Sequence, residues 1–118
     1  MRTRDEEIKA YITKDGSSIK ELMHPDHHNV KNQSLAEATV PTGIKTALHL
    51  HKKTEELYFI SSGIGDMTLG DDTFRVSPGD TICIPPNTPH CIFNCGPDEL
   101  KFFCACSPAY SHEDTVLL

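Results

Sequence analysis

Short stretches in which apolar and polar residues alternate recur along the chain, roughly every 8 to 12 residues, with glycine, proline, asparagine and aspartate between them. A period of two puts the apolar side chains on one face of an extended strand, whereas the helical period of about 3.6 residues is nearly absent. This pattern is typical of an antiparallel sandwich or barrel. It predicts an all-β fold with strands at residues 9–13, 18–23, 34–40, 46–51, 56–62, 65–69, 72–76, 81–84, 90–94 and 101–107.

Turn residues separate these strands. Residues 14–16 and 70–72 suit tight hairpins, and residues 77–80 suit a type I or II turn in which proline fixes φ. The longest irregular segment, residues 24–33, contains three histidines. Its proline and amide residues favour a solvated loop over a metal site, and they leave open that the loop folds over a pocket mouth.

Composition narrows the possible partners. The length of 118 residues indicates one domain, and 11 basic against 17 acidic residues give a formal net charge of -6. Because no basic run is present, nucleic acid is not an expected partner. The N-terminus lacks an apolar segment, and nowhere do about 18 apolar residues follow one another. We therefore expect neither a signal peptide nor a membrane span, and a cytoplasmic location.

The cysteines form an odd set without a C-x-x-C pair: Cys83, Cys91, Cys95, Cys104 and Cys106. Free buried thiols are the favoured interpretation. Cys104 and Cys106 are two residues apart and therefore point to one face of a strand. If that face is the interior, a thiol could approach a metal ion or line a substrate pocket.

Two histidines offer the most specific chemistry. His49 and His51 share one face of a predicted strand, and Glu56 follows at the start of the next apolar run. With His90 they supply three nitrogens and one carboxylate oxygen, a set that suits a first-row metal ion. Incidental histidines on an exposed face are the plain alternative. Strand register decides between Glu56 and the adjacent Glu55, and the spacing favours Glu56.

The surrounding residues extend this set into two motifs. The first contains Gly43, His49, His51, Glu56 and Gly63, and the second contains Gly79, Pro85, Asn87, His90 and Asn94. In order and spacing the two motifs resemble those of the cupin superfamily, over residues 34–107. Asn87 stands where that family usually has glycine, and asparagine is the residue that tolerates left-handed backbone geometry best after glycine.

The resemblance implies a small, single-domain jelly-roll β-barrel with His49, His51, Glu56 and His90 as ligands of one divalent ion: Fe, Mn, Ni, Co or Zn. Residues 34–107 would form the barrel core. Residues 1–33 would complete the barrel or a dimer, and residues 108–118 would form a C-terminal tail, in which Tyr110 could pack at an interface. Homodimers are usual among similar proteins.

Strand register then predicts which residues line the pocket. Lys45 shares the inward face with the histidine pair if no bulge intervenes, Tyr58 shares it with Glu56, and Asn94 shares it with His90. With Cys104 they are the candidate substrate-binding residues. Lys45 could hold a carboxylate or phosphate, or reach solvent at the barrel rim. The opposite face of its strand is unusually apolar, which hints at a second sheet or a subunit contact: Ile44, Thr46, Leu48 and Leu50.

Three functions are open at this point. The favoured one is a metalloenzyme acting on a small polar molecule, of the dioxygenase, decarboxylase or sugar-phosphate isomerase type found among proteins that resemble it. Glu56 and Tyr58 are the candidate catalytic residues. The second is a barrel that binds or senses a small ligand without turnover. The third is a structural metal, which a site without thiolate ligands disfavours.

Overall fold

The computed structural model describes residues 1–118, and its regular structure is almost entirely extended. It contains no helix with the length and apolar character needed to cross a bilayer. A 3₁₀ turn, Asp5–Glu7, precedes the strands β1 (Tyr11–Ile12), β2 (Ser18–Met23), β3 (Ser34–Val40), β4 (His49–His51), β5 (Glu55–Ser62), β6 (Gly65–Leu69), β7 (Asp72–Val76), β8 (Thr81–Ile84), β9 (His90–Asn94), β10 (Leu100–Ser107) and β11 (Thr115–Leu117). The predicted all-β fold is confirmed.

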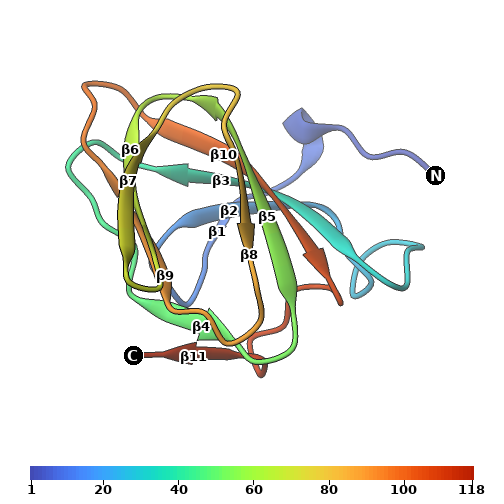
Figure 1. Cartoon of the computed structure of the whole chain (residues 1–118). Helices are drawn as coiled ribbons and strands as arrows, with labels where there is room; N and C mark the ends of the chain where they lie inside the picture. Colours follow the sequence, from blue (N-terminus) through green and yellow to red (C-terminus); the bar gives the residue numbers. More distant parts are fainter.

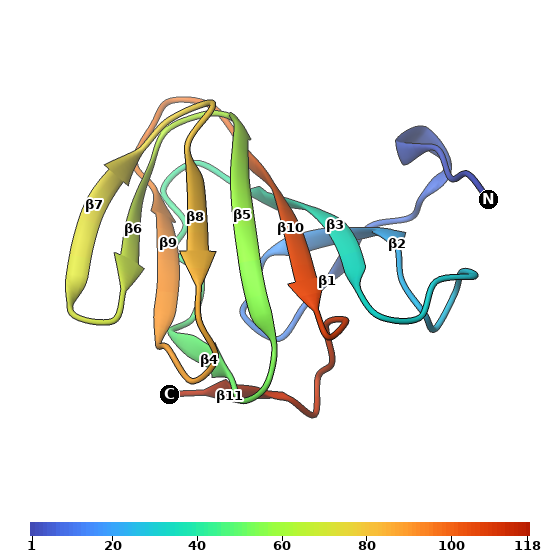
Figure 2. The same cartoon turned by 45° about the vertical axis from the view of Figure 1, so that its right-hand side comes forward.

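The strands form two antiparallel sheets that curve around one interior (Figures 1 and 2). The six-stranded sheet has the order β1-β2-β3-β10-β5-β8, and the five-stranded sheet has the order β11-β4-β9-β6-β7. Strands adjacent in a sheet are thus often distant in sequence, as in a jelly-roll barrel. This topology brings β4 and β9 of one sheet to face β5 and β10 of the other.

Alternation along the central strands builds the core. On β5 and β10, every second residue is buried while its neighbours face outward. The inward side chains of both sheets join in one apolar cluster that includes Ile60, Met67, Ile92 and Phe102. Burying each such side chain contributes about 1.5–3 kcal/mol. The alternation of apolar and polar residues in the sequence therefore predicts the inner faces of β5 and β10 correctly.

The strand expected at residues 46–51 is shorter than predicted. Only His49–His51 form β4, and Lys45 makes an isolated bridge with Phe93. Thr46 turns inward because its hydroxyl accepts a hydrogen bond from the Ile92 backbone N–H at 3.0 Å. The outward orientation expected for Ile44, Thr46, Leu48 and Leu50 is confirmed for Ile44 and Leu48, which are exposed, and is wrong for Thr46, which is buried.

The C-terminal segment was expected to be a tail but contains a strand. β11 pairs antiparallel with β4 and forms one edge of the five-stranded sheet, with Thr115 opposite His51. Figures 1 and 2 both show this strand lying alongside β4. The end of the chain therefore borders the strand that carries the histidine pair.

Among the residues with positive φ, Gly63 and Asn87 bear on the predicted motifs. Gly63, between β5 and β6, has φ +88°, and a Cβ there would lie 2.6 Å from the Glu99 carbonyl oxygen. Asn87 has φ 62° and is the one residue other than glycine with a positive φ. The left-handed geometry expected where asparagine replaces the family's glycine is thus confirmed.

Candidate metal centre

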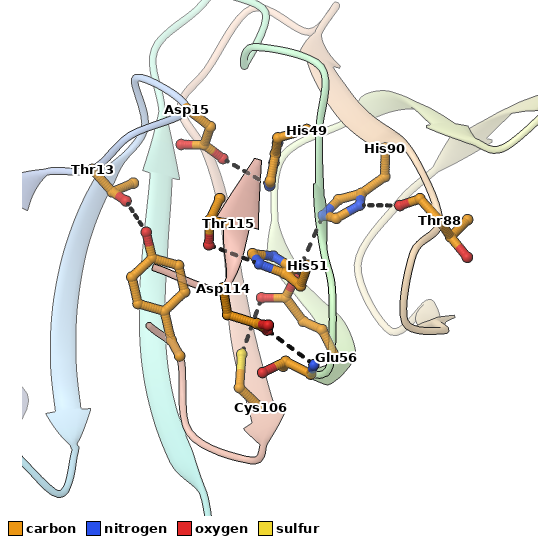
Figure 3. A network of polar contacts seen from close by, with 12 residues as sticks. Thr13, Asp15, His49, His51, Glu56, Thr88, His90, Cys106, Asp114 and Thr115 are labelled. Atoms are coloured by element: carbon orange, nitrogen blue, oxygen red, sulfur yellow. Dashed lines mark hydrogen bonds and ion pairs between the residues drawn. The ribbon is translucent and has the colours of Figure 1, made fainter. Parts of the chain in front are cut away.

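Three histidines meet inside the barrel. His49 and His51 are the two ends of β4, His90 begins β9 directly opposite His49, and all three side chains are buried. One ring nitrogen from each lies within 4.8 Å of the other two. The period-two spacing of the pair on one strand and its pairing with β9 produce this convergence, as Figure 3 shows.

Hydrogen bonds fix the orientation of each imidazole. The Nδ1 atoms of His49 and His90 lie 2.7 and 2.9 Å from the carbonyl oxygens of Ala47 and Thr88. Because a carbonyl only accepts, each Nδ1 must carry the proton and donate. His51 Nδ1 lies 2.9 Å from the Thr115 hydroxyl, which itself donates to the Ser111 carbonyl. All three rings therefore keep an Nε2 lone pair available for a metal ion.

Glu56 supplies an oxygen next to these lone pairs. Its Oε1 lies 3.1 Å from His51 Nε2 and 3.5 Å from His90 Nε2. Glu56 Oε1 and His90 Nε2 are both buried without a hydrogen-bond partner. Acceptors in contact with acceptors repel one another unless a proton or a cation lies between them. The arrangement therefore fits a divalent cation, and burial selects Glu56 over the exposed Glu55.

Neighbouring elements hold Glu56 in place. Its Oε2 accepts a hydrogen bond from the Cys106 thiol at 3.3 Å. The turn before β5 is tied to the C-terminal segment, because the Asp114 carboxylate accepts the backbone N–H groups of Lys53 and Thr54. Figure 3 shows Asp114 and Cys106 close to Glu56. The carboxylate is thus positioned from β5, β10 and the approach to β11.

The charge states of the buried groups follow from this packing. Burial raises the pKa of Glu56, but hydrogen bonds and positive charge from His51 and His90, when these rings are protonated on both nitrogens, lower that pKa more strongly, to about 2. Burial and the neighbouring His90 lower the pKa of His49, which favours its neutral form. Burial and the Glu56 charge raise the pKa values of Cys104 and Cys106, so both thiols keep their protons. Glu56 is therefore a carboxylate, and with a cation in place of the second protons on His51 and His90 the site would offer neutral imidazoles beside it.

A cavity of about 510 Å³, its open mouth included, adjoins these ligands. Tyr58 and Cys104 line it, as the sequence predicts. Lys45 does not line the cavity. Residues 46–48 between it and His49 are not part of a strand, and the Lys45 side chain is exposed. Its expected inward orientation is wrong. Asn94 is fully buried outside the cavity, where its amide donates to the carbonyl oxygens of Val40 and Asp98.

The cysteines and the histidine-rich segment have structural surroundings. All five cysteines are free, and Cys91, Cys104 and Cys106 are buried. Residues 24–28 form a loop apart from the three clustered histidines, as expected from their polar composition. His24 is buried, with its Nε2 2.8 Å from the Tyr110 carbonyl oxygen.

Sequence reasoning missed several residues around the centre. Asp15, in the turn between β1 and β2, places its Oδ2 3.7 Å from His49 Nε2. Glu21 and Tyr110 line the cavity, and Thr115 orients His51. In the sequence, Asp15 and Gly16 are fully explained as residues of a tight turn, so Asp15 was not expected at the site. No local pattern reveals that this turn reaches across to β4, because the contact joins residues far apart in sequence.

Comparisons with known proteins agree with this architecture. The family model described as "Cupin domain" matches residues 36–106. An uncharacterized protein of Methanocaldococcus jannaschii is 54% identical over 118 residues, which cover 100% of this chain and 94% of that protein. A mannose-1-phosphate guanylyltransferase of Salmonella typhimurium is 33% identical over 87 residues, 74% of this chain, and the match spans only 18% of that enzyme.

Among solved structures, the Streptomyces nucleoside dehydratase Pac13 superposes with a TM-score of 0.81. The match covers 100% of this chain and 90% of the dehydratase at 18% sequence identity. At that identity the likeness concerns the fold and not the reaction. The jelly-roll barrel expected from the two motifs is therefore confirmed.

Proposed function

Because the chain belongs to the cupin domain family, we propose that it is a metal-dependent enzyme that acts on a small polar molecule. His49, His51, His90 and Glu56 would together hold one divalent ion, Fe, Mn, Ni, Co or Zn. Residues 34–107 supply this centre, residues 1–33 complete the cavity wall, and residues 108–118 close one side of it.

The contact between Glu56 Oε1 and the imidazole nitrogens carries this proposal. A buried carboxylate oxygen 3.1 Å from an Nε2 whose ring proton is on Nδ1 needs a second ring proton or a cation to offset the repulsion, and three imidazoles around one carboxylate favour the cation. A structural zinc site would use closed tetrahedral coordination, often with thiolates. Here the clustered ligand atoms are imidazole nitrogens, and the Cys106 thiol faces Glu56, to which it donates a hydrogen bond.

A bound divalent ion with these four ligands would keep open positions and act as a Lewis acid toward a substrate oxygen. Residues of the cavity wall would determine which substrate binds next to the ion. Tyr58 lines the cavity beside His90, with ring centroids 6.2 Å apart, and burial raises the pKa of its phenol. Tyr58 would therefore act as a hydrogen-bond donor to substrate. Glu56 would be the candidate for proton transfer.

The experiment is to purify the protein without added metal, measure its metal content by elemental analysis, and follow oxygen uptake with small acids, thiols and sugars. The proposal expects about one ion per chain in the wild type and loss of most of it in His49→Ala and His90→Ala, with the β-rich circular dichroism retained. Oxygen uptake that disappears in His51→Ala would identify an oxygenase. A protein that binds no divalent ion would contradict the proposal.

The same experiment distinguishes the proposed enzyme from the second candidate function, a protein that binds or senses a small ligand without turnover. A bound ion without turnover, together with ligand-induced increases in melting temperature, would favour a binding or sensor protein. The small molecule would then be a ligand and not a substrate.

We also propose a homodimer formed through the outer face of the six-stranded sheet. Leu35, Leu57 and Phe59 are 40%, 42% and 46% exposed there. They are neighbours across strands, because Ala105 of β10 pairs with both Leu35 and Leu57. A second copy covering this face would bury the apolar side chains. Sedimentation of the wild type and of Leu57→Asp tests this.

A cytoplasmic location is part of the proposal and is supported by the five free cysteines.

A further inference from the structure

We propose that the cavity binds a non-anionic small molecule whose hydrogen-bond donors, hydroxyl or ammonium groups, are received by Glu21 and Asp15. These two residues would be binding residues and not metal ligands. The inference rests on the proposed function, because it names the substrate class for the same centre.

Glu21 supplies the strongest observation. Its side chain comes from β2, is only 8% exposed, and lines the cavity. Its Oε1 accepts a hydrogen bond from the Tyr11 hydroxyl at 2.7 Å. Its Oε2 is buried and has no hydrogen-bond partner. Buried carboxylate oxygens in folded proteins are almost always paired, so an unpaired one in a cavity wall indicates a missing donor.

Asp15 presents a second acceptor closer to the metal ligands. Its Oδ1 is fixed by the backbone N–H and the hydroxyl of Ser17, at 2.9 and 2.6 Å. Its Oδ2 faces His49 Nε2 at 3.7 Å, which is too long for a hydrogen bond. One oxygen therefore holds the carboxylate in place, and the other points toward the centre, as Figure 3 shows. A donor group on a ligand would complete its coordination.

The charges of the cavity wall oppose an anionic ligand. Its charged side chains are the carboxylates of Asp15, Glu21 and Glu56, and the imidazoles of His49 and His51 are the neutral ligands of the proposed ion. Three carboxylates against a divalent ion leave a formal excess of one negative charge. A ligand carboxylate or phosphate would increase this excess, whereas a hydroxyl would leave it unchanged and an ammonium would neutralise it. The exposed Lys45, outside the cavity, cannot compensate.

The position of Glu21 also defines how a ligand enters. Tyr11, Glu21 and Tyr110 line both the inner cavity and a wider outer depression bordered by the loop at His24 and by Lys31. A donor group that passes from this depression to the centre would meet Glu21 first and Asp15 second. Glu21 would therefore select ligands at the entrance to the metal site.

Three matched compounds test the selection: 1,2-propanediol, 1-amino-2-propanol and lactate. They share a three-carbon chain and a 2-hydroxyl and differ in a neutral, cationic or anionic group. Their dissociation constants would be obtained from melting-temperature shifts of the protein as isolated, with its metal content measured in parallel. The variants are Glu21→Gln and Asp15→Asn. The control is Glu55→Gln, which removes an exposed carboxylate on the outward face of β5.

We expect the wild type to bind the amine and the diol at least tenfold more tightly than lactate. Glu21→Gln and Asp15→Asn should each weaken binding of the amine about tenfold or more, the effect of losing a charge-assisted hydrogen bond, while retaining the metal. Glu55→Gln should behave as the wild type. Equal shifts for the three compounds, a preference for lactate, or an unchanged preference in both cavity variants would overturn the inference. A wild type without metal that still prefers donors would contradict the proposed function but not this inference.

Discussion

Replacing Thr115 by valine tests how the protein orients His51. Thr115 is buried on β11, and its hydroxyl accepts the Nδ1 proton of His51 at 2.9 Å while donating to the Ser111 carbonyl at 2.9 Å. Valine has nearly the same shape but cannot take part in either hydrogen bond. The substitution therefore leaves a buried imidazole N–H without an acceptor and frees the ring to rotate.

The expected magnitudes follow from these two lost hydrogen bonds. An unsatisfied buried donor costs about 1–3 kcal/mol, so the free energy of unfolding of the metal-free protein should fall by about that amount. Loss of a partner that orients a ligand imidazole should raise the metal dissociation constant about 10- to 100-fold. The first quantity is measured by urea denaturation, and the second by competition with a chelating fluorophore.

Thr115→Ser is the matched control, because it keeps the hydroxyl and removes one methyl group. It should lose about 1 kcal/mol of stability through the missing methyl and keep wild-type metal affinity. If Thr115→Val binds the ion as tightly as the wild type does, the hydroxyl does not orient His51 and the reasoning fails. If Thr115→Ser weakens binding as much as Thr115→Val, packing and not hydrogen bonding is responsible.

Of four further predictions, two concern pH, one concerns the carboxylate Glu56 and one concerns the turn at Gly63. Because neutral imidazoles bind the ion, metal affinity should fall below about pH 6; equal affinity at pH 8 and pH 5 would exclude imidazole ligation. The lowered pKa of the buried His49 means that the unfolded chain, titrating near 6.5, binds more protons in acid. The metal-free protein should therefore become less stable as pH falls below 6.5, by at most about 1.4 kcal/mol per pH unit from this group, measured by urea denaturation. Glu56→Gln should weaken metal binding at least as much as Thr115→Val, measured with the same chelator. Gly63→Ala should destabilise the fold by more than about 1 kcal/mol in urea because its Cβ meets backbone at 2.6 Å, with metal affinity unchanged.

The centre could be predicted from the sequence where local periodicity decides geometry. His49 and His51 lie two residues apart, so an extended backbone alone directs both imidazoles to one side. The same alternation makes Glu56 buried and Glu55 exposed. At position 87, a residue that tolerates positive φ marks the turn before His90. The histidine pair needs only the local period of two, whereas the choice of Glu56 and the geometry at Asn87 also used the spacing of the two motifs that resemble the cupin superfamily.

The cavity could not be predicted in the same way, because its walls come from segments distant in sequence. Thr115 reaches His51 across 64 positions, and the β1–β2 turn brings Asp15 to His49. Nothing in the local pattern of either segment shows its pairing partner. The prediction for Lys45 was wrong although it used only local alternation. Alternation directs the Lys45 side chain inward, but the Ile92 backbone N–H donates to the Thr46 hydroxyl, which turns Thr46 inward and Lys45 outward.

The effect of Glu56→Gln on the metal-free protein distinguishes a functional carboxylate from a structural one. Glutamine keeps the shape of Glu56, and its amide can donate to the His51 or His90 nitrogens that now face an unpaired oxygen. The neutral side chain also removes a buried charge. Compared with a wild type whose imidazoles are neutral, the metal-free variant should therefore be more stable, while binding the ion more weakly. A metal-free Glu56→Gln protein that is less stable than the wild type would mean that the carboxylate supports the barrel itself, and the argument that its position requires a cation would be lost.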